Sequence, residues 1–217
     1  MSRARALAVV DLLIVLVVLA IASPAAAQGP GGISVRLFGL ASEQQFAAQD
    51  TFNATFGSSR GIFWGGGIEV VLPDGIFADL AVSRFQKTGQ RAFISGGQAF
   101  GLGIPLTATV TPIEVTGGYR FRLKHIPVVP YIGVGVGSYG YQETSSFSDP
   151  TDSVDERKIG VLGLVGAEVR VHTWVRASVD VQDTRITGIL GSGGLSQQAN
   201  ENDLGGLAVR FRIILGR

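Results

Sequence analysis

The chain has 217 residues, a formal net charge of +1 at pH 7 and no cysteine. This balance of charge excludes the broad basic field that nucleic-acid-binding proteins present to phosphates. The lack of cysteine excludes a disulfide scaffold and thiolate zinc sites, so stability must come from hydrogen bonds and packing. Glycine contributes 31 residues, about twice the usual share of ~7%, without the repeat of a collagen.

The N-terminal segment has the organisation of a secretory signal peptide. Two arginines form a basic start, an unbroken apolar run extends from Leu12 to Ala22, and a small-residue cleavage site ends at Ala27. The apolar run is short for a membrane-spanning helix, which needs about 20 residues. We therefore expect residues 1–27 to be a cleaved signal peptide and residues 28–217 to form one domain of balanced charge.

Beyond the leader, the chain alternates between apolar and polar residues with a period of two, the pattern of β-strands that separate unlike environments. On one such segment, Ile113, Val115 and Tyr119 fall on one face, and Glu114 and Arg120 fall on the other. The predicted strands are 33–40, 61–72, 76–87, 106–123, 128–142, 158–171, 175–185 and 204–215. No amphipathic helix of useful length competes with these eight strands.

The predicted connections alternate in length along the chain. The long ones are 41–60, 88–105, 143–157 and 187–203, and the short ones are 73–75, 124–127 and 172–174. This rhythm is typical of barrels in bacterial outer membranes, which have short periplasmic turns and long external loops. Within the first long connection, Asp50 could cap a helical turn that carries Phe52 and Phe56, and an irregular loop is the alternative.

The position of the charged residues decides between a membrane barrel and a soluble barrel. One register of the strands is almost wholly apolar, and the other collects the charges. The predicted lumen charge network consists of Arg36, Glu69, Asp79, Glu114, Arg120, Arg122, Glu168, Arg170, Arg176, Asp180, Arg210 and Arg212. In a soluble lipocalin-like carrier the apolar register would be the interior, whereas in a membrane barrel it faces lipid.

Two observations favour the membrane. Large apolar side chains occur on all eight strands, more than an eight-stranded interior can pack. The aromatic residues expected to form an interfacial girdle near the strand ends are Trp64, Tyr119, Phe121, Trp174 and Phe211. The sequence therefore predicts an all-β fold, an eight-stranded antiparallel up-and-down transmembrane β-barrel.

Four stretches, GGGIEVVLPDGIF, VTPIEVTGGYRFRL, VPYIGVGVGSYGY and GLAVRFRI, resemble small bacterial outer-membrane β-barrel proteins of the OmpA, OmpX and OmpW kind. The resemblance implies a monomer in the bacterial outer membrane that contacts membrane lipid and lipopolysaccharide and is inserted by the barrel-insertion machinery. Such barrels usually end in an aromatic residue, whereas this sequence ends Ile-Leu-Gly-Arg. Phe211 or Leu215 would have to carry the insertion signal, and no peptidoglycan-binding domain is expected after the last strand.

The favoured function is a structural, surface-contact or adhesion role through the external loops, with the lumen filled by paired charges. The alternative is a narrow channel or a passage for small hydrophobic solutes. A lipid-modifying enzyme is less favoured, because the only histidines, His125 and His172, fall in the short turns, away from an outer-rim catalytic site. The sequence predicts no enzymatic activity, cofactor, metal site or nucleic-acid partner.

Overall fold

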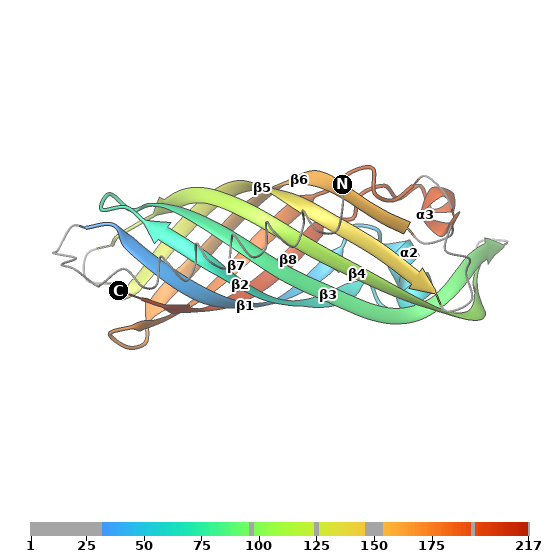
Figure 1. Cartoon of the computed structure of the whole chain (residues 1–217), viewed down its shortest axis with the longest axis horizontal. Coiled ribbons are helices and arrows are strands. Elements are labelled where there is room, and N and C mark those ends of the chain that lie inside the picture. Colours follow the sequence, from blue (N-terminus) through green and yellow to red (C-terminus); the bar gives the residue numbers. More distant parts are fainter. Residues whose placement is uncertain (1–31, 96–97, 124–125, 146–153, 192–193, 217) are drawn as a thin grey trace, which may run out of the picture. The chain divides into compact units, whose positions relative to one another are not determined.

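The computed structural model describes residues 32–95, 98–123, 126–145, 154–191 and 194–216, so the predicted signal peptide lies outside the described residues. Residues from Ser34 onward form one compact unit. Its strands are β1 (Ser34–Phe46), β2 (Arg60–Val71), β3 (Ile76–Ser95), β4 (Gln98–Arg120), β5 (Val128–Ser145), β6 (Val154–Arg170), β7 (Val175–Arg185) and β8 (Gly206–Leu215). Each strand pairs antiparallel with the next, and β8 pairs with β1 to close the barrel (Figure 1). The predicted fold is confirmed.

The alternation along the strands separates an apolar exterior from a polar interior. Val134 and Ile159 are 70% and 71% exposed, whereas Glu69 and Asp180 are 0% and 1% exposed. A soluble barrel would have the opposite orientation, because exposing large aliphatic side chains to water is unfavourable. The barrel therefore has the orientation suited to lipid, and the lipocalin-like alternative does not fit it.

The apolar exterior forms a belt of limited height. Along β4 and the residue that follows it, the belt extends from Ile113 to Phe121, roughly 26 Å along the chain, or about 20 Å along the axis at the usual tilt of about 40°. On each of seven strands, followed towards the loop end, the outward side chains are apolar up to a first polar residue. These residues are Glu43, Arg60, Arg84, Thr111, Ser138, Arg157 and Asp183. They mark the loop-side edge of the belt.

The long connections contain more regular structure than the sequence predicts. β3 and β4 stay paired far past the belt, so most of the predicted loop 88–105 is strand (Figure 1). Helix α2 (Gln49–Phe56) lies where a helical turn was one alternative, and the short α3 (Gly194–Gln198) lies in the connection before β8. No helix in the described part of the chain is long and apolar enough to span a membrane.

The turn between β2 and β3 follows the predicted chemistry. Its Gly75 has a φ of 90°, a conformation that residues with a side chain rarely adopt. The backbone N–H of Gly75 donates to the carbonyl of Leu72, and the N–H of Leu72 donates to that of Ile76. The turns between β2 and β3 and between β6 and β7 lie at one end of the barrel, opposite α2 and α3 (Figure 1).

Candidate functional site

The charged residues of the inward register meet in the half of the lumen nearer the short turns. Glu168 on β6 lies 3.2 Å from Arg36 on β1 and 3.0 Å from Arg176 on β7, and it is also ion-paired with Arg120 on β4. Glu69 on β2 pairs with the same Arg36 and lies 3.2 Å from Arg120. Two carboxylates and three guanidinium groups therefore bridge five strands. We call these five residues the lower cluster.

A second set of ion pairs lies in the lumen on the loop side of the lower cluster. Asp180 on β7 lies 2.5 Å from Arg210 and 3.4 Å from Arg212, two neighbouring inward residues of β8. Arg212 also pairs with Asp79 on β3 at 3.1 Å, and Arg210 lies 3.6 Å from Glu114 on β4. These five residues form the upper cluster, which crosses the lumen from β7 and β8 to β3 and β4.

Tyr131 on β5 connects the two clusters. Its hydroxyl donates to Asp180 at 2.7 Å and accepts from Arg212 at 2.8 Å. Its ring lies 5.6 Å from the guanidinium carbon of Arg120 and 5.3 Å from that of Arg212, within cation–π range of both. Gly166 makes room for this arrangement, because a Cβ there would come within 2.4 Å of Asp180 and 2.6 Å of the Tyr131 ring.

The two clusters are balanced in charge, with five arginines against five carboxylates. All the carboxylates and all the arginines except the half-buried Arg176 are buried. Such charges are costly unless each one is paired, and here every member has an ion-pair partner. The arrangement is suited to holding strands together, because no carboxylate is left without a guanidinium group nearby.

Two residues of the predicted network lie elsewhere. Arg122 and Arg170 are exposed, so their predicted position in the lumen is wrong. Arg170 is the last residue of β6, and Arg122 lies two residues past the end of β4. At these positions the barrel wall ends, and a long side chain can reach water.

The half of the lumen nearer the loops is filled by apolar side chains. Phe46 stacks on Phe52 of α2 at 4.0 Å between ring centroids, and Phe85 lies 5.2 Å from both Phe46 and Phe63. The aromatic cluster comprises Phe46, Ala48, Phe52, Phe63, Phe85, Ala108, Val110, Tyr139, Tyr141, Ile186, Ile189, Leu190 and Leu204. Its members come from the five strands β1 to β5, from α2 and the residue before it, and from the segment between β7 and β8. Apolar packing therefore closes this end.

The connections that cover the aromatic cluster are fixed by hydrogen bonds. The Glu201 carboxylate accepts from the backbone N–H groups of Asp50 and Thr51, both at 2.9 Å, at the start of α2. It thereby caps the helix from a distant segment, whereas the predicted cap, Asp50, lies inside the helix and its side chain caps nothing. Asp203 accepts from the N–H groups of Ile186 and Gly205, both at 2.8 Å.

Sequence reasoning missed several polar members of the lumen. Tyr139 donates to Glu114 at 2.8 Å, and Gln182 donates to the same carboxylate at 3.1 Å. Tyr131, which is buried on the inward face of β5, is not among the predicted network residues. Alternation alone could have found them, because every second residue of β5 and β7 faces inward.

The predicted aromatic girdle is exterior but not uniform in height. Tyr119 and Phe121, in contact at 5.0 Å between centroids, lie at the short-turn end of β4, and Trp174 lies in the turn between β6 and β7. Trp64 and Phe211 are exposed within β2 and β8 rather than at their ends, so that part of the prediction is wrong. Trp64 nevertheless lies near the loop-side edge of the belt.

The described residues offer little for catalysis. His172 is exposed in the β6–β7 turn, and His125 lies outside the described residues. No group of three or more metal-ligating side chains is found in the part of the chain that the structure describes. The lumen carboxylates are held by arginines, which is unlike a free acid–base pair.

Comparisons with known proteins agree with this geometry. Residues 13–211 match the family described as "Outer membrane protein beta-barrel domain". Neisserial surface protein A has 14% sequence identity and a TM-score of 0.53, with 84% of this chain and 96% of that chain covered. The N-terminal β-barrel domain of Pseudomonas aeruginosa OprF has 12% identity and a TM-score of 0.50, with 86% and 99% covered. At such identities the similarity shows the fold alone. No curated protein sequence matches this chain significantly.

Proposed function

This chain belongs to the outer-membrane β-barrel family, and from that premise we propose that it is a monomeric, non-enzymatic barrel whose lumen is a structural core and whose loop end makes contacts at the cell surface. The apolar belt supports direct contact with membrane lipid and lipopolysaccharide. The exposed Phe211 and Leu215 are the outward apolar residues of β8 that we assign to recognition by the insertion machinery.

The single observation that carries this proposal is the filling of the lumen along its length. The lower and upper clusters cross the barrel from wall to wall, and the aromatic cluster closes the loop end. A conducting pore needs a continuous water-filled path, and rigid ion pairs between opposite walls oppose one. The narrow-channel alternative is therefore the weaker candidate.

The β3–β4 hairpin is the element that we propose makes the surface contact. It continues past the belt edge at Arg84 and presents hydroxyl, amide and basic side chains there. The hairpin is braced by a hydrogen bond of 2.9 Å between the hydroxyls of Thr88 and Thr107. It also lies against α2, because a Cβ on Gly89 would come within 2.1 Å of the Thr55 carbonyl. Such a braced projection is suited to reaching a second surface.

Planar-bilayer recording tests the structural lumen. We expect purified protein, folded as judged by heat-modifiable gel migration, to give no steady conductance in potassium chloride. A double substitution of Phe46 and Phe52 to alanine opens the loop end only, and it is expected to remain silent because the two ion-pair clusters persist. Steady conductance of the unaltered protein that changes on Arg120→Gln would contradict the proposal and favour the channel.

A shortened hairpin tests the surface role. Residues 89–106 are replaced by Asn-Gly, so that the Thr88–Thr107 pair flanks a two-residue turn. Laboratory bacteria that display either protein are then compared for self-aggregation and for adherence to cultured cells and to glass. We expect the shortened barrel to keep its heat-modifiable migration and to lose adherence. Equal adherence of both strains, or none with either, would dismiss the hairpin as a contact element.

A further inference from the structure

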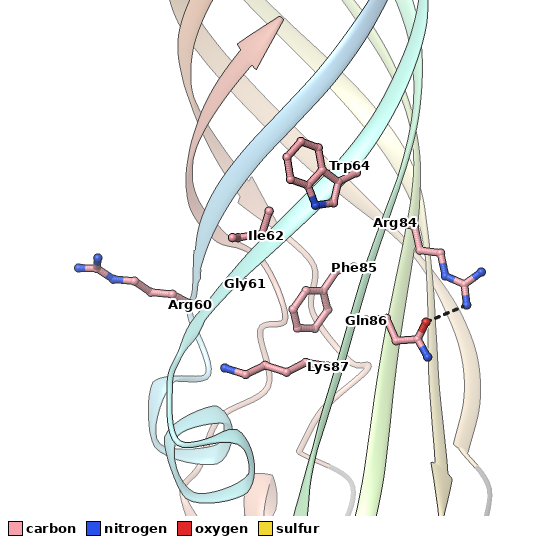
Figure 2. Close-up of a pocket in the computed structure, with 8 residues that line it drawn as sticks. All are labelled: Arg60, Gly61, Ile62, Trp64, Arg84, Phe85, Gln86 and Lys87. Atoms are coloured by element: carbon pink, nitrogen blue, oxygen red, sulfur yellow. Dashed lines mark hydrogen bonds between the residues drawn. The ribbon is translucent and has the colours of Figure 1, made fainter.

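The barrel wall is incomplete between β2 and β3 on its loop side. The pairing of β2 with β3 ends at Trp64 and Arg84. Beyond that pair, β2 continues to Arg60 with only β1 as its partner, and β3 continues with only β4. The two unpaired edges enclose a groove of about 550 Å³ (Figure 2). It is lined by Arg60, Gly61, Ile62, Trp64, Arg84, Phe85, Gln86 and Lys87.

The groove combines an apolar wall with basic rims. Ile62 and Trp64 are 55% and 65% exposed on β2, and the buried Phe85 ring belongs to the aromatic cluster. Figure 2 shows Phe85 and Lys87 projecting from β3 towards β2, with Arg60 and Arg84 on the outer sides of the two strands. Apolar surface beside several cations is the combination that an anionic amphiphile requires.

These cations are weakly neutralised. Arg60 lies 3.4 Å from Glu43, but both side chains are exposed. Such an ion pair is weak, so another anion can replace Glu43 as the partner of Arg60. Arg84 donates to the neutral Gln86 at 3.3 Å. Within the described ranges, no carboxylate forms an ion pair with Arg84 or Lys87. The groove therefore has unused positive charge, in contrast with the balanced lumen.

The position of the groove relative to the apolar belt indicates which kind of ligand it binds. Arg60 and Arg84 are the first outward polar residues of β2 and β3, and Ile62 and Trp64 are the last outward apolar residues of β2 on that side. The groove thus straddles the belt edge, where lipid headgroups meet acyl chains and where Trp prefers to lie. A free anion would use only the basic rims, and an added peptide strand would make no particular use of the cations.

We propose that the β2–β3 groove binds an anionic phosphorylated lipid of the surrounding leaflet. Its phosphate lies at Lys87, which reaches across the groove, and the exposed side chains of Arg60 and Arg84 turn towards it from the rims. An acyl chain follows Trp64 and Ile62 down the outside of β2. This inference rests on the membrane belt and the wall gap, and it is independent of the role of the hairpin at the cell surface.

Quenching of Trp64 fluorescence by brominated lipid tests the site. The chain has two tryptophans, so Trp174→Phe leaves Trp64 as the reporter. The protein is reconstituted in phosphatidylcholine vesicles that contain a small fraction of acyl-brominated lipid, either phosphatidic acid or phosphatidylcholine. We expect phosphatidic acid to be enriched at Trp64 by about five-fold for each basic residue that contacts its phosphate.

Substitution of the cations completes the test. Lys87→Gln and Arg84→Gln are each expected to reduce the enrichment by about five-fold. The matched control is Lys158→Gln on β6, an exposed cation outside the groove, which should leave the enrichment unchanged. Every variant is first checked for folding by heat-modifiable migration, so that loss of binding is separated from loss of the barrel.

Three results would overturn the lipid assignment. Equal quenching by the two brominated lipids would show that Trp64 meets only bulk membrane. Full relief of the quenching by inorganic phosphate would indicate a site for free anions. Relief by a peptide with the sequence of residues 60–71 would indicate that the unpaired edges accept a strand.

Discussion

The two halves of the lumen fill the same cylinder with opposite chemistry. Near the short turns, ten charged side chains bridge the walls, and near the loops a cluster rich in phenylalanine does so. Apolar packing is non-directional and tolerates exchange of one apolar residue for another, whereas a buried charge needs its particular partners. The charged half should therefore be intolerant of small chemical changes, and the aromatic half should be tolerant of them.

Glu168→Gln is expected to have the largest effect on this comparison. The substitution nearly preserves shape but removes the negative charge shared by Arg36, Arg120 and Arg176. Arg36 and Arg120 keep Glu69 as a partner, but the cluster is left with one carboxylate for three guanidinium groups. This excess of positive charge in a buried site is expected to lower the free energy of unfolding by about 3–5 kcal/mol. The free energy of unfolding is measured by urea titration in lipid vesicles, with the folded fraction monitored by gel migration.

The control for this change is Glu43→Gln, which breaks the exposed pair with Arg60. It is expected to cost no more than about 1 kcal/mol. Similar losses for the two variants would contradict the view that the lumen ion pairs are special because they are buried.

Tyr131→Phe tests the connection between the two clusters. The ring remains, with its cation–π contacts, but Arg212 loses an acceptor and Asp180 loses a donor. The expected loss is about 1–3 kcal/mol in the same unfolding measurement, since two buried polar groups each lose one partner. A loss equal to that of Glu168→Gln would mean that the two clusters act as one unit.

Phe46→Leu tests the tolerance of the aromatic half. Leucine keeps the site apolar, and the neighbouring rings of Phe52 and Phe85 can adjust. We expect a loss of about 1.5 kcal/mol or less, typical of apolar exchanges that conserve most of the volume. A larger loss than that of Tyr131→Phe would show that the aromatic half is as specific as the charged half.

Glu201→Ala is expected to have the smallest effect. It removes the carboxylate that accepts from the first turn of α2, worth about 1 kcal/mol of local helix stability. Hydrogen exchange should be faster in α2 and unchanged in the strands, because the helix is an addition to the barrel. Faster exchange in β1 or β2 would contradict this separation.

The sequence was sufficient to predict the barrel because its signal is periodic and repeated on every strand. Ile113, Glu114 and Val115 each lie on the face that alternation assigns to them. Alternation gives a face but not a height, so it could not tell that Arg122 and Arg170 lie where the wall ends. Nor could it pair Glu201 with α2, since that contact joins segments 150 residues apart.

The lower cluster also bears on how the chain enters a membrane. Its five members come from β1, β2, β4, β6 and β7, so the ion pairs exist only when strands from both ends of the sequence have met. An open, half-assembled sheet within the bilayer would expose unpaired guanidinium and carboxylate groups to hydrocarbon, at a cost of several kcal/mol each. Neutralising these charges requires the sheet to curl until β1 meets β6 and β7, so an open sheet is disfavoured in hydrocarbon relative to the curled one.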